Sequence, residues 1–146
     1  MTERIDEYIK QPSCANVCCI DDKGFPYCFS CFYAYNSNEK LLYYKSPLDA
    51  KHSKIIVTDP LVAGTILPDK LNKLHVKGMQ FEGTVLPLDH PLTRNAATYY
   101  YKKNPVAVAM PGEIWTIQIN SLKLTDSSFG FGKKLTWNRE ELEVIL

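Results

Sequence analysis

Apolar and polar residues alternate with a period of two along most of this chain, which is the pattern of strands that bury one face. Most of these runs are separated by short polar segments, so neighbouring runs are expected to pair as antiparallel strands. The segment Asp21-Asp22-Lys23-Gly24 has the composition of a hairpin turn between the first two runs. The expected strands cover residues 14–20, 27–35, 40–45, 61–67, 74–86, 115–120 and 135–137.

Three other segments carry apolar residues at helical spacing. The first has an apolar face of Ile5, Tyr8 and Ile9, and the second has a proline in its first turn, as helix starts often do. The expected helices cover residues 2–10, 46–57 and 89–103, with Thr2, Ser46 and Asp89 as their N-caps.

The long strand over 74–86 changes its apolar phase near Gly78, which predicts a β-bulge at that residue. Strands outnumber helices, and consecutive strands lie too close in sequence for helical crossovers. The pattern therefore predicts a mainly β fold, a closed antiparallel Greek-key barrel with peripheral helices. The length of 146 residues fits a single domain covering 1–146.

Composition narrows the functional classes. A formal net charge of +1 gives no global attraction to nucleic acid or to a membrane surface, so any anion site is local. The acidic N-terminal segment does not have the pattern of a signal peptide, and we expect a cytoplasmic protein. Five cysteines, an odd number, favour reduced thiols that serve as small apolar side chains.

The segment from Lys45 to His52 is the strongest local candidate for an anion site. A helix capped by Ser46 presents unpaired amides and the positive end of its dipole, and Lys45 and Lys51 add ammonium groups. Such a corner suits a phosphate group. The alternative is an ordinary capped helix with solvated lysines, in which His52 is a buried, hydrogen-bonded histidine.

Other motifs point to little chemistry of their own. Cys28 and Cys31 have the spacing of half a zinc site, but residues three apart in a strand point to opposite faces. The run Phe129-Gly130-Phe131-Gly132-Lys133-Lys134 has no Walker spacing, although its glycines would let backbone approach a planar ligand. The sequence presents no catalytic triad, so a cofactor is expected to carry any enzymatic chemistry.

Two motifs give the chain a family resemblance. They are Gly78-Met79-Gln80-Phe81-Glu82-Gly83 and the tail Gly130-Phe131-Gly132-Lys133-Lys134 with Trp137. Over nearly its whole length the chain resembles the pyridoxamine 5′-phosphate oxidase-like FMN-binding split barrels, in particular a small bacterial subgroup with this tail. The resemblance implies a split β-barrel that forms a homodimer, with FMN held at the subunit interface.

The resemblance also implies which residues contact the cofactor. The strand that lies along the flavin matches Ser30 to Tyr35, and the phosphate-binding positions match Lys45-Ser46 and Ala50-Lys51-His52. A ring-contacting glutamine aligns with Gly78, between Lys77 and Gln80, and the tail would reach the partner's flavin. The implied cofactor-binding residues are Ser30, Cys31, Phe32, Tyr33, Tyr35, Lys45, Ser46, Lys51, His52, Lys77, Gly78, Gln80, Lys133 and Trp137.

Three functions follow as hypotheses. The first is an FMN-dependent oxidoreductase acting on an unidentified small molecule, with a nicotinamide as one candidate electron donor. The Arg-x-His that handles pyridoxamine in the oxidases is absent, so oxidation of pyridoxamine phosphate itself is not implied. The second is a flavin-binding sensor or carrier without turnover. The third is a small barrel that binds single-stranded nucleic acid through its tyrosines, which the near-neutral charge disfavours.

Overall fold

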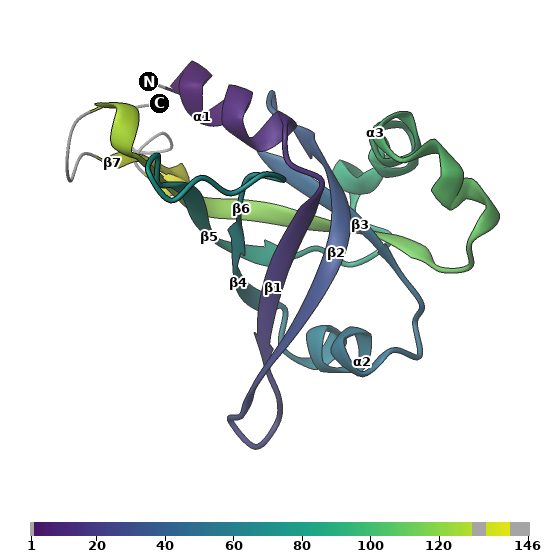
Figure 1. Cartoon of the computed structure of the whole chain (residues 1–146). Coiled ribbons are helices and arrows are strands. Elements are labelled where there is room, and N and C mark those ends of the chain that lie inside the picture. The colour runs from purple at the N-terminus through teal and green to yellow at the C-terminus, as the bar shows by residue number, and fades with distance from the viewer. Residues whose placement is uncertain (1, 130–133, 141–146) are drawn as a thin grey trace.

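The computed structural model describes residues 2–129 and 134–140 and contains a barrel of antiparallel strands with helices around it (Figure 1). The strands are β1 (Cys14–Ile20), β2 (Pro26–Asn36), β3 (Leu41–Ser46), β4 (Leu61–Ile66), β5 (Lys77–Val85), β6 (Glu113–Asp126) and β7 (Lys134–Asn138). The helices are α1 (Thr2–Lys10), α2 (Lys51–Thr58) and α3 (Ala96–Lys103), with 3-10 turns η1 (Pro91–Thr93), η2 (Pro105–Ala109) and η3 (Ser127–Phe129).

Six strands close into the barrel. They follow the order β3-β2-β1-β4-β5-β6, and β6 pairs back to β3 from Glu113 to Gln118. Because β1, β2 and β3 form a meander and β4 returns beside β1, the connection is a Greek key. The predicted mainly β Greek-key barrel with peripheral helices is therefore confirmed.

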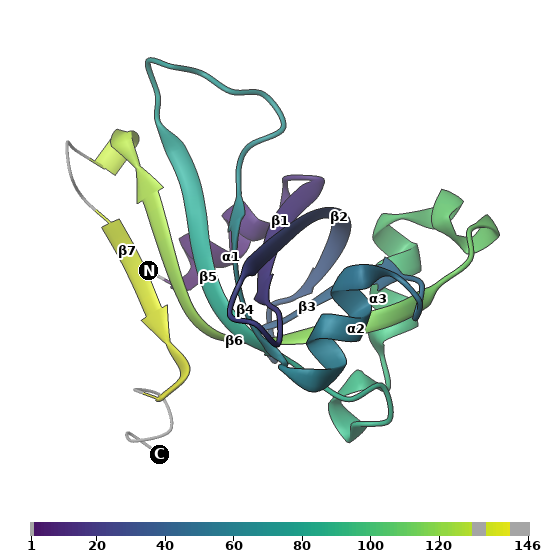
Figure 2. The same ribbon diagram turned by 90° about the horizontal axis from the view of Figure 1, so that it is seen from below.

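Strand β6 pairs with two different strands where the barrel closes (Figure 2). Its first half pairs with β3, and on the same edge its second half pairs with β7 from Ser121 to Thr125. The guanidinium of Arg139 lies at the join, donating to the carbonyl oxygens of Ile119 (2.8 Å), Glu39 (3.0 Å) and Lys40 (3.1 Å). This arginine satisfies carbonyls where one neighbouring strand gives way to the next.

A bulge in β6 reverses which residues face inward. Glu82 pairs with Ser121, but the next residue of β5, Gly83, pairs with Ile119, so Asn120 is the extra residue. Accordingly Trp115, Ile117 and Ile119 face the core before it, whereas Leu122 and Leu124 do so after it. The prediction of a bulge at Gly78 is wrong, because β5 begins only at Lys77 and the irregularity lies opposite Glu82 and Gly83.

Helices α1 and α2 lie at opposite ends of the barrel in Figure 1, and α3 packs outside β2 and β3. Helix α1 buries the predicted face of Ile5, Tyr8 and Ile9. The ammonium group of Lys103 on α3 donates to the carbonyl oxygens of Lys10 (2.6 Å) and Pro12 (3.1 Å), and so it closes the C-terminal end of α1.

The predicted helix start at Ser46 is wrong. Ser46 is the last residue of β3 and pairs with Glu113, and α2 begins at Lys51 with Ala50 as its N-cap. The indole N–H of Trp115 donates to the Ser46 carbonyl oxygen at 3.0 Å, which holds this residue in the strand. Tertiary pairing thus prevails over a local capping preference.

The third predicted helix is also divided. His90, rather than Asp89, caps the turn η1, since its Nδ1 accepts the backbone N–H of Leu92 at 3.0 Å. The α-helix itself begins at Ala96, because residues 94 and 95 form a turn.

The tyrosines of β2 and β3 lie inside the molecule. Tyr33, Tyr35, Tyr43 and Tyr44 are buried, as is Tyr100 of α3. A barrel interior and a second cluster under α3 together bury these rings. These five tyrosines therefore cannot stack on the bases of a single-stranded nucleic acid.

The close packing of β4 against β1 and β5 requires a glycine at position 64. A Cβ atom there would lie 2.3 Å from the carbonyl oxygen of Asn16 and 2.4 Å from Cζ of Phe81. We predict that Gly64→Ala lowers the free energy of unfolding by about 3 kcal/mol, measured by urea denaturation. Gly78→Ala is the matched control, because its Cβ would meet a flexible leucine methyl at 3.2 Å. Equal losses in both variants would contradict the account.

Candidate functional site

The outer surface of the sheet carries two rows of mostly polar side chains that cross it from β2 to β7. Residues paired across antiparallel strands share a face, so each row follows from the register. The Gln80 row consists of Ser30, Asn16, Thr65, Gln80, Lys123 and Thr136. The Glu82 row consists of Cys28, Cys18, Ala63, Glu82, Ser121 and Asn138.

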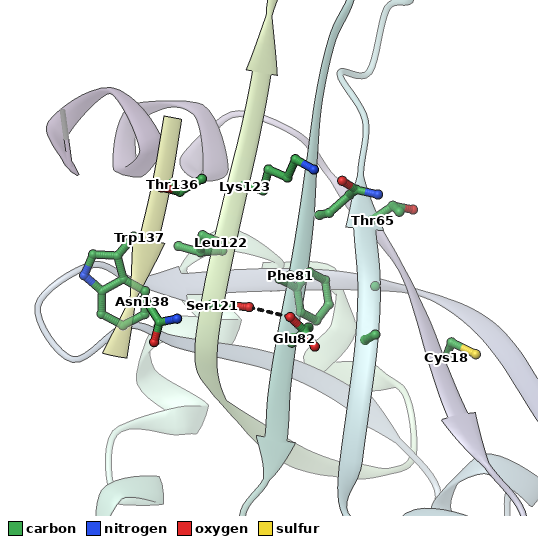
Figure 3. Close-up of a pocket in the computed structure, with 13 residues that line it drawn as sticks. Cys18, Thr65, Phe81, Glu82, Ser121, Leu122, Lys123, Thr136, Trp137 and Asn138 are labelled. Carbon is green, nitrogen blue, oxygen red and sulfur yellow. Dashed lines mark hydrogen bonds between the residues drawn. The ribbon is translucent and has the colours of Figure 1, made fainter. Parts of the chain in front are cut away.

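A groove of about 650 Å³ lies on this face (Figure 3). It extends from Cys18 on β1 across β4, β5 and β6 to Trp137 and Asn138 on β7. Its centre is formed by Thr65, Gln80, Lys123, Glu82 and Ser121, which come from both rows.

Several of these side chains are already fixed by hydrogen bonds. The hydroxyl of Ser30 donates to Oδ1 of Asn16 at 2.7 Å, and the hydroxyl of Ser121 donates to Oε1 of Glu82 at 2.9 Å. Lys123 provides a positive charge in the groove, next to Gln80 on β5. A hydroxyl, an amide and an ammonium group thus stand in line on Thr65, Gln80 and Lys123.

Strand β7 forms one end of the groove, but the ring of its Trp137 turns to the other face of the sheet. Trp137 pairs with the inward-facing Leu122 and packs partly against the core, and the charged groups of Lys40 and Arg139 lie 5.9 and 5.3 Å from its ring centroid. The groove is therefore a shallow and mostly polar site, with Thr136 and Asn138 as the outward residues of β7.

Four of the sequence-predicted residues lie on this outer face. Gln80 lines the groove itself, and Ser30 belongs to the Gln80 row. Gly78 and Phe32 lie one step further along the same face of β5 and β2, where Phe32 is 59% exposed. The structure therefore brings these four to one surface.

Five others turn inward, Trp137 among them, and a sixth turns toward α3. The hydroxyls of Tyr33 and Tyr35 donate to the Ile9 carbonyl oxygen and to Asp6 (2.6 Å), under α1, and the Cys31 thiol is packed against the core. Lys77 pairs with Asp126 at 3.6 Å. The Lys45 ammonium donates to the hydroxyl of Tyr101 (2.8 Å) and the carbonyl oxygen of Ala107 (2.7 Å). Lys133 lies outside the described residues.

The remaining three predicted residues gather near the start of α2. The Ser46 hydroxyl and Nε2 of His52 are 2.6 Å apart, and the His52 ring stacks on Phe29 with centroids 3.8 Å apart. Lys51 lies over the ring of Tyr27, with its Nζ 4.5 Å from the centroid. His52 is therefore hydrogen-bonded and half-buried, while Ser46 is too enclosed to meet a ligand directly.

Sequence reasoning missed Lys123 and Thr65. The expected strand ended at residue 120, and the bulge at Asn120 reverses the phase that earlier residues of β6 suggested. Leu122 and Leu124, which alternate with Lys123, were the signal that the strand continues. Thr65 stands on an expected strand, but its partnership with Gln80 depends on register.

Two kinds of feature are missing from the residues that the structure describes. They contain no group of three or more His, Cys, Asp or Glu side chains placed to hold a metal ion. Within these same ranges, no helix combines the length and the apolar character needed to span a membrane.

The closed six-stranded Greek-key barrel, with its helices and its extra strand β7, defines the fold class: the molecule is a split β-barrel. No model of a known protein family matches the chain. It is 34% identical over 113 residues to a UPF0306 protein of Photorhabdus laumondii, covering 77% of this chain and 79% of that one. The chain belongs to the UPF0306 family.

Solved structures share the fold at low sequence identity. A haem-binding protein of Mycobacterium smegmatis superposes with a TM-score of 0.79 at 12% identity, over 95% of this chain and 58% of that one. A protein of the pyridoxine phosphate oxidase family from Clostridium acetobutylicum gives 0.67 at 10%, over 97% and 96%. A FAD-binding protein of Mesorhizobium loti gives 0.64 at 17%, over 84% and 91%.

The burial of His52 predicts how the stability of the protein depends on pH. Burial lowers the pKa of His52, so its neutral form is favoured in the folded protein. Its contribution to stability is complete above the unfolded pKa of about 6.5 and is lost as the pH falls from there toward the folded value. We predict that the urea midpoint falls less between pH 7.5 and 5.5 in His52→Gln than in the parent, where both proteins retain His75 and His90. An identical fall in both would contradict the assignment.

Proposed function

We propose that this chain binds FMN in the groove over β4 to β7 and uses it in oxidation and reduction of a small molecule. The observation that carries the proposal is the line of Thr65, Gln80 and Lys123 across the groove on the outer face. The FAD-binding and pyridoxine phosphate oxidase-family neighbours support it, since they use the same fold.

The groove fits the ring system of a flavin. Its volume of about 650 Å³ lies within the range of roughly 300 to 1,000 Å³ that is typical of small-molecule sites. An isoalloxazine has alternating carbonyl and nitrogen groups along one edge, which match the donors of Gln80 and Lys123. Bound FMN would supply the capacity to take up and release electrons, and these side chains would position the ring and tune its charge.

The start of α2 is the proposed phosphate contact. Ala50 makes no side-chain cap hydrogen bond, so no N-cap side chain accepts from the first amides of α2, which stand at the positive end of the helix. Lys51 adds an ammonium group there. Ser46 and His52 would then act as supports, because their side chains bond to each other, and Lys45 would play no part.

A second copy of the chain is proposed to cover the outer face. Phe32 is 59% exposed and Ile20 is 40% exposed on the strands that continue the two rows. A partner packed there would remove apolar surface from water and enclose the flavin between two chains. Ser30 and Gly78 would border that interface.

FMN titration, followed by the absorption spectrum and quenching of flavin fluorescence, tests the site. We predict that Lys123→Ala and Lys51→Ala each weaken binding by about 1 to 3 kcal/mol, or roughly five- to 150-fold, because each removes a charge-assisted hydrogen bond.

The matched controls are Lys102→Ala on α3 and Lys54→Ala on α2, both exposed lysines. Each should bind FMN as the parent does. Unchanged affinity in Lys123→Ala would show that the flavin ring does not bind in the groove. Unchanged affinity in Lys51→Ala alone would rule out only the phosphate contact.

A flavin carrier without turnover is the second candidate. In its favour, the groove carboxylate, Glu82, is already engaged by Ser121, so the groove offers little for moving protons. Stopped-flow mixing with NADH or NADPH separates the two. For an oxidoreductase with a nicotinamide donor, we predict that protein-bound FMN is reduced at least tenfold faster than free FMN. Equal rates would contradict this use of the flavin and favour the carrier.

A further inference from the structure

Two cysteines face each other across the β1–β2 hairpin. Cys18 pairs directly with Cys28 in the register, and both belong to the Glu82 row on the outer face. The other pairs of this hairpin combine different residue types, such as Cys14 with Phe32 and Ala15 with Cys31. Cys18 also lines the groove.

The pairing is of the kind that places two side chains closest together. The N–H of Asp21 donates to the Phe25 carbonyl oxygen (2.9 Å), and the N–H of Tyr33 donates to that of Ser13 (3.3 Å), which marks both as hydrogen-bonded pairs. Since the two kinds of pair alternate, Cys18 and Cys28 form a non-hydrogen-bonded pair. Their Cα atoms are then about 4.5 Å apart, within the range of about 4.4 to 6.8 Å that a disulfide spans.

The two thiols are neighbours. Burial, and after it the neighbouring Cys28 side chain, raises the pKa of Cys18, whose thiol donates to the carbonyl oxygen of Cys19 at 3.8 Å. Cys28 is exposed, whereas Cys18 is only partly so. Cys28 is therefore the group that a dissolved oxidant meets first, with Cys18 beside it.

The remaining three cysteines have no comparable partner. Cys19 and Cys31 face the interior, where their thiols donate to the carbonyl oxygens of Tyr27 (3.3 Å) and Ala15 (3.9 Å), and burial raises the pKa of Cys31 to about 12. Cys14 is exposed, but it lies four residues from Cys18 along β1, roughly 13 Å away.

We propose that Cys18 and Cys28 form a redox-active dithiol that closes to a cross-strand disulfide at the margin of the groove. The oxidant is a low-molecular-weight disulfide such as glutathione disulfide. The Cys28 thiolate attacks one of its sulfurs and releases one thiol, leaving a mixed disulfide. The Cys18 thiolate then attacks the Cys28 sulfur and releases the second thiol. Two cysteine protons leave, two glutathione thiols form, and one S–S bond replaces another.

The test uses the purified, fully reduced chain, incubated with glutathione disulfide and then quenched with an alkylating reagent. Intact mass and peptide mapping are expected to show a Cys18–Cys28 crosslink, with loss of two hydrogen atoms, that dithiothreitol reverses. Cys18→Ser should accumulate a glutathione adduct on Cys28, because the resolving thiol is gone. Cys14→Ser, the matched control, should form the crosslink at the parent rate.

Two outcomes would overturn the proposal. One is a parent protein in which Cys18 and Cys28 both still react with the alkylating reagent after prolonged exposure to glutathione disulfide. The other is a stable glutathione adduct on Cys28 in the parent, which would show that Cys18 cannot reach it. Because no flavin is present, either result leaves the proposed FMN site untouched.

Discussion

The structure depends on a single strand that must satisfy three neighbours. β6 pairs with β5 along one edge, while its other edge is shared by β3 and β7. Closure of the barrel requires the pairing with β3, and the bulge at Asn120 lets β6 pass from β3 to β7 while keeping apolar residues inside. Arg139 satisfies the carbonyl oxygens at the change of partner. Without this junction the sheet would have exposed edges.

The candidate site is a consequence of that junction. Because the bulge shifts the phase of β6, Lys123 faces outward and joins Gln80 and Thr65 in one row. The addition of β7 beyond β6 then extends the groove to Thr136 and Asn138. The same outward alternation on β1 and β2 brings Cys18 beside Cys28 at the opposite margin. One groove thus has a polar line at its centre and a thiol pair at one end.

The sequence predicted the strands well, because half-buried strands impose a period of two that survives in a single chain. Of the residues that the family resemblance implied, Gln80 lies in the groove, whereas the Trp137 side chain turns to the core. What it could not provide was register: which outward residues become neighbours depends on pairings between strands far apart in the chain. The helix start at Ser46 failed for a related reason, since pairing with Glu113 and the bond from Trp115 keep that residue in β3.

The central claim is that a flavin occupies the outer groove, and hydrogen exchange measures this location most directly. Amide exchange of the chain is compared with and without saturating FMN, segment by segment. The account predicts slower exchange in residues 63–65, 80–82 and 121–123, with α3 unchanged. Slower exchange only in α3 or α1, with no change in these three segments, would contradict it.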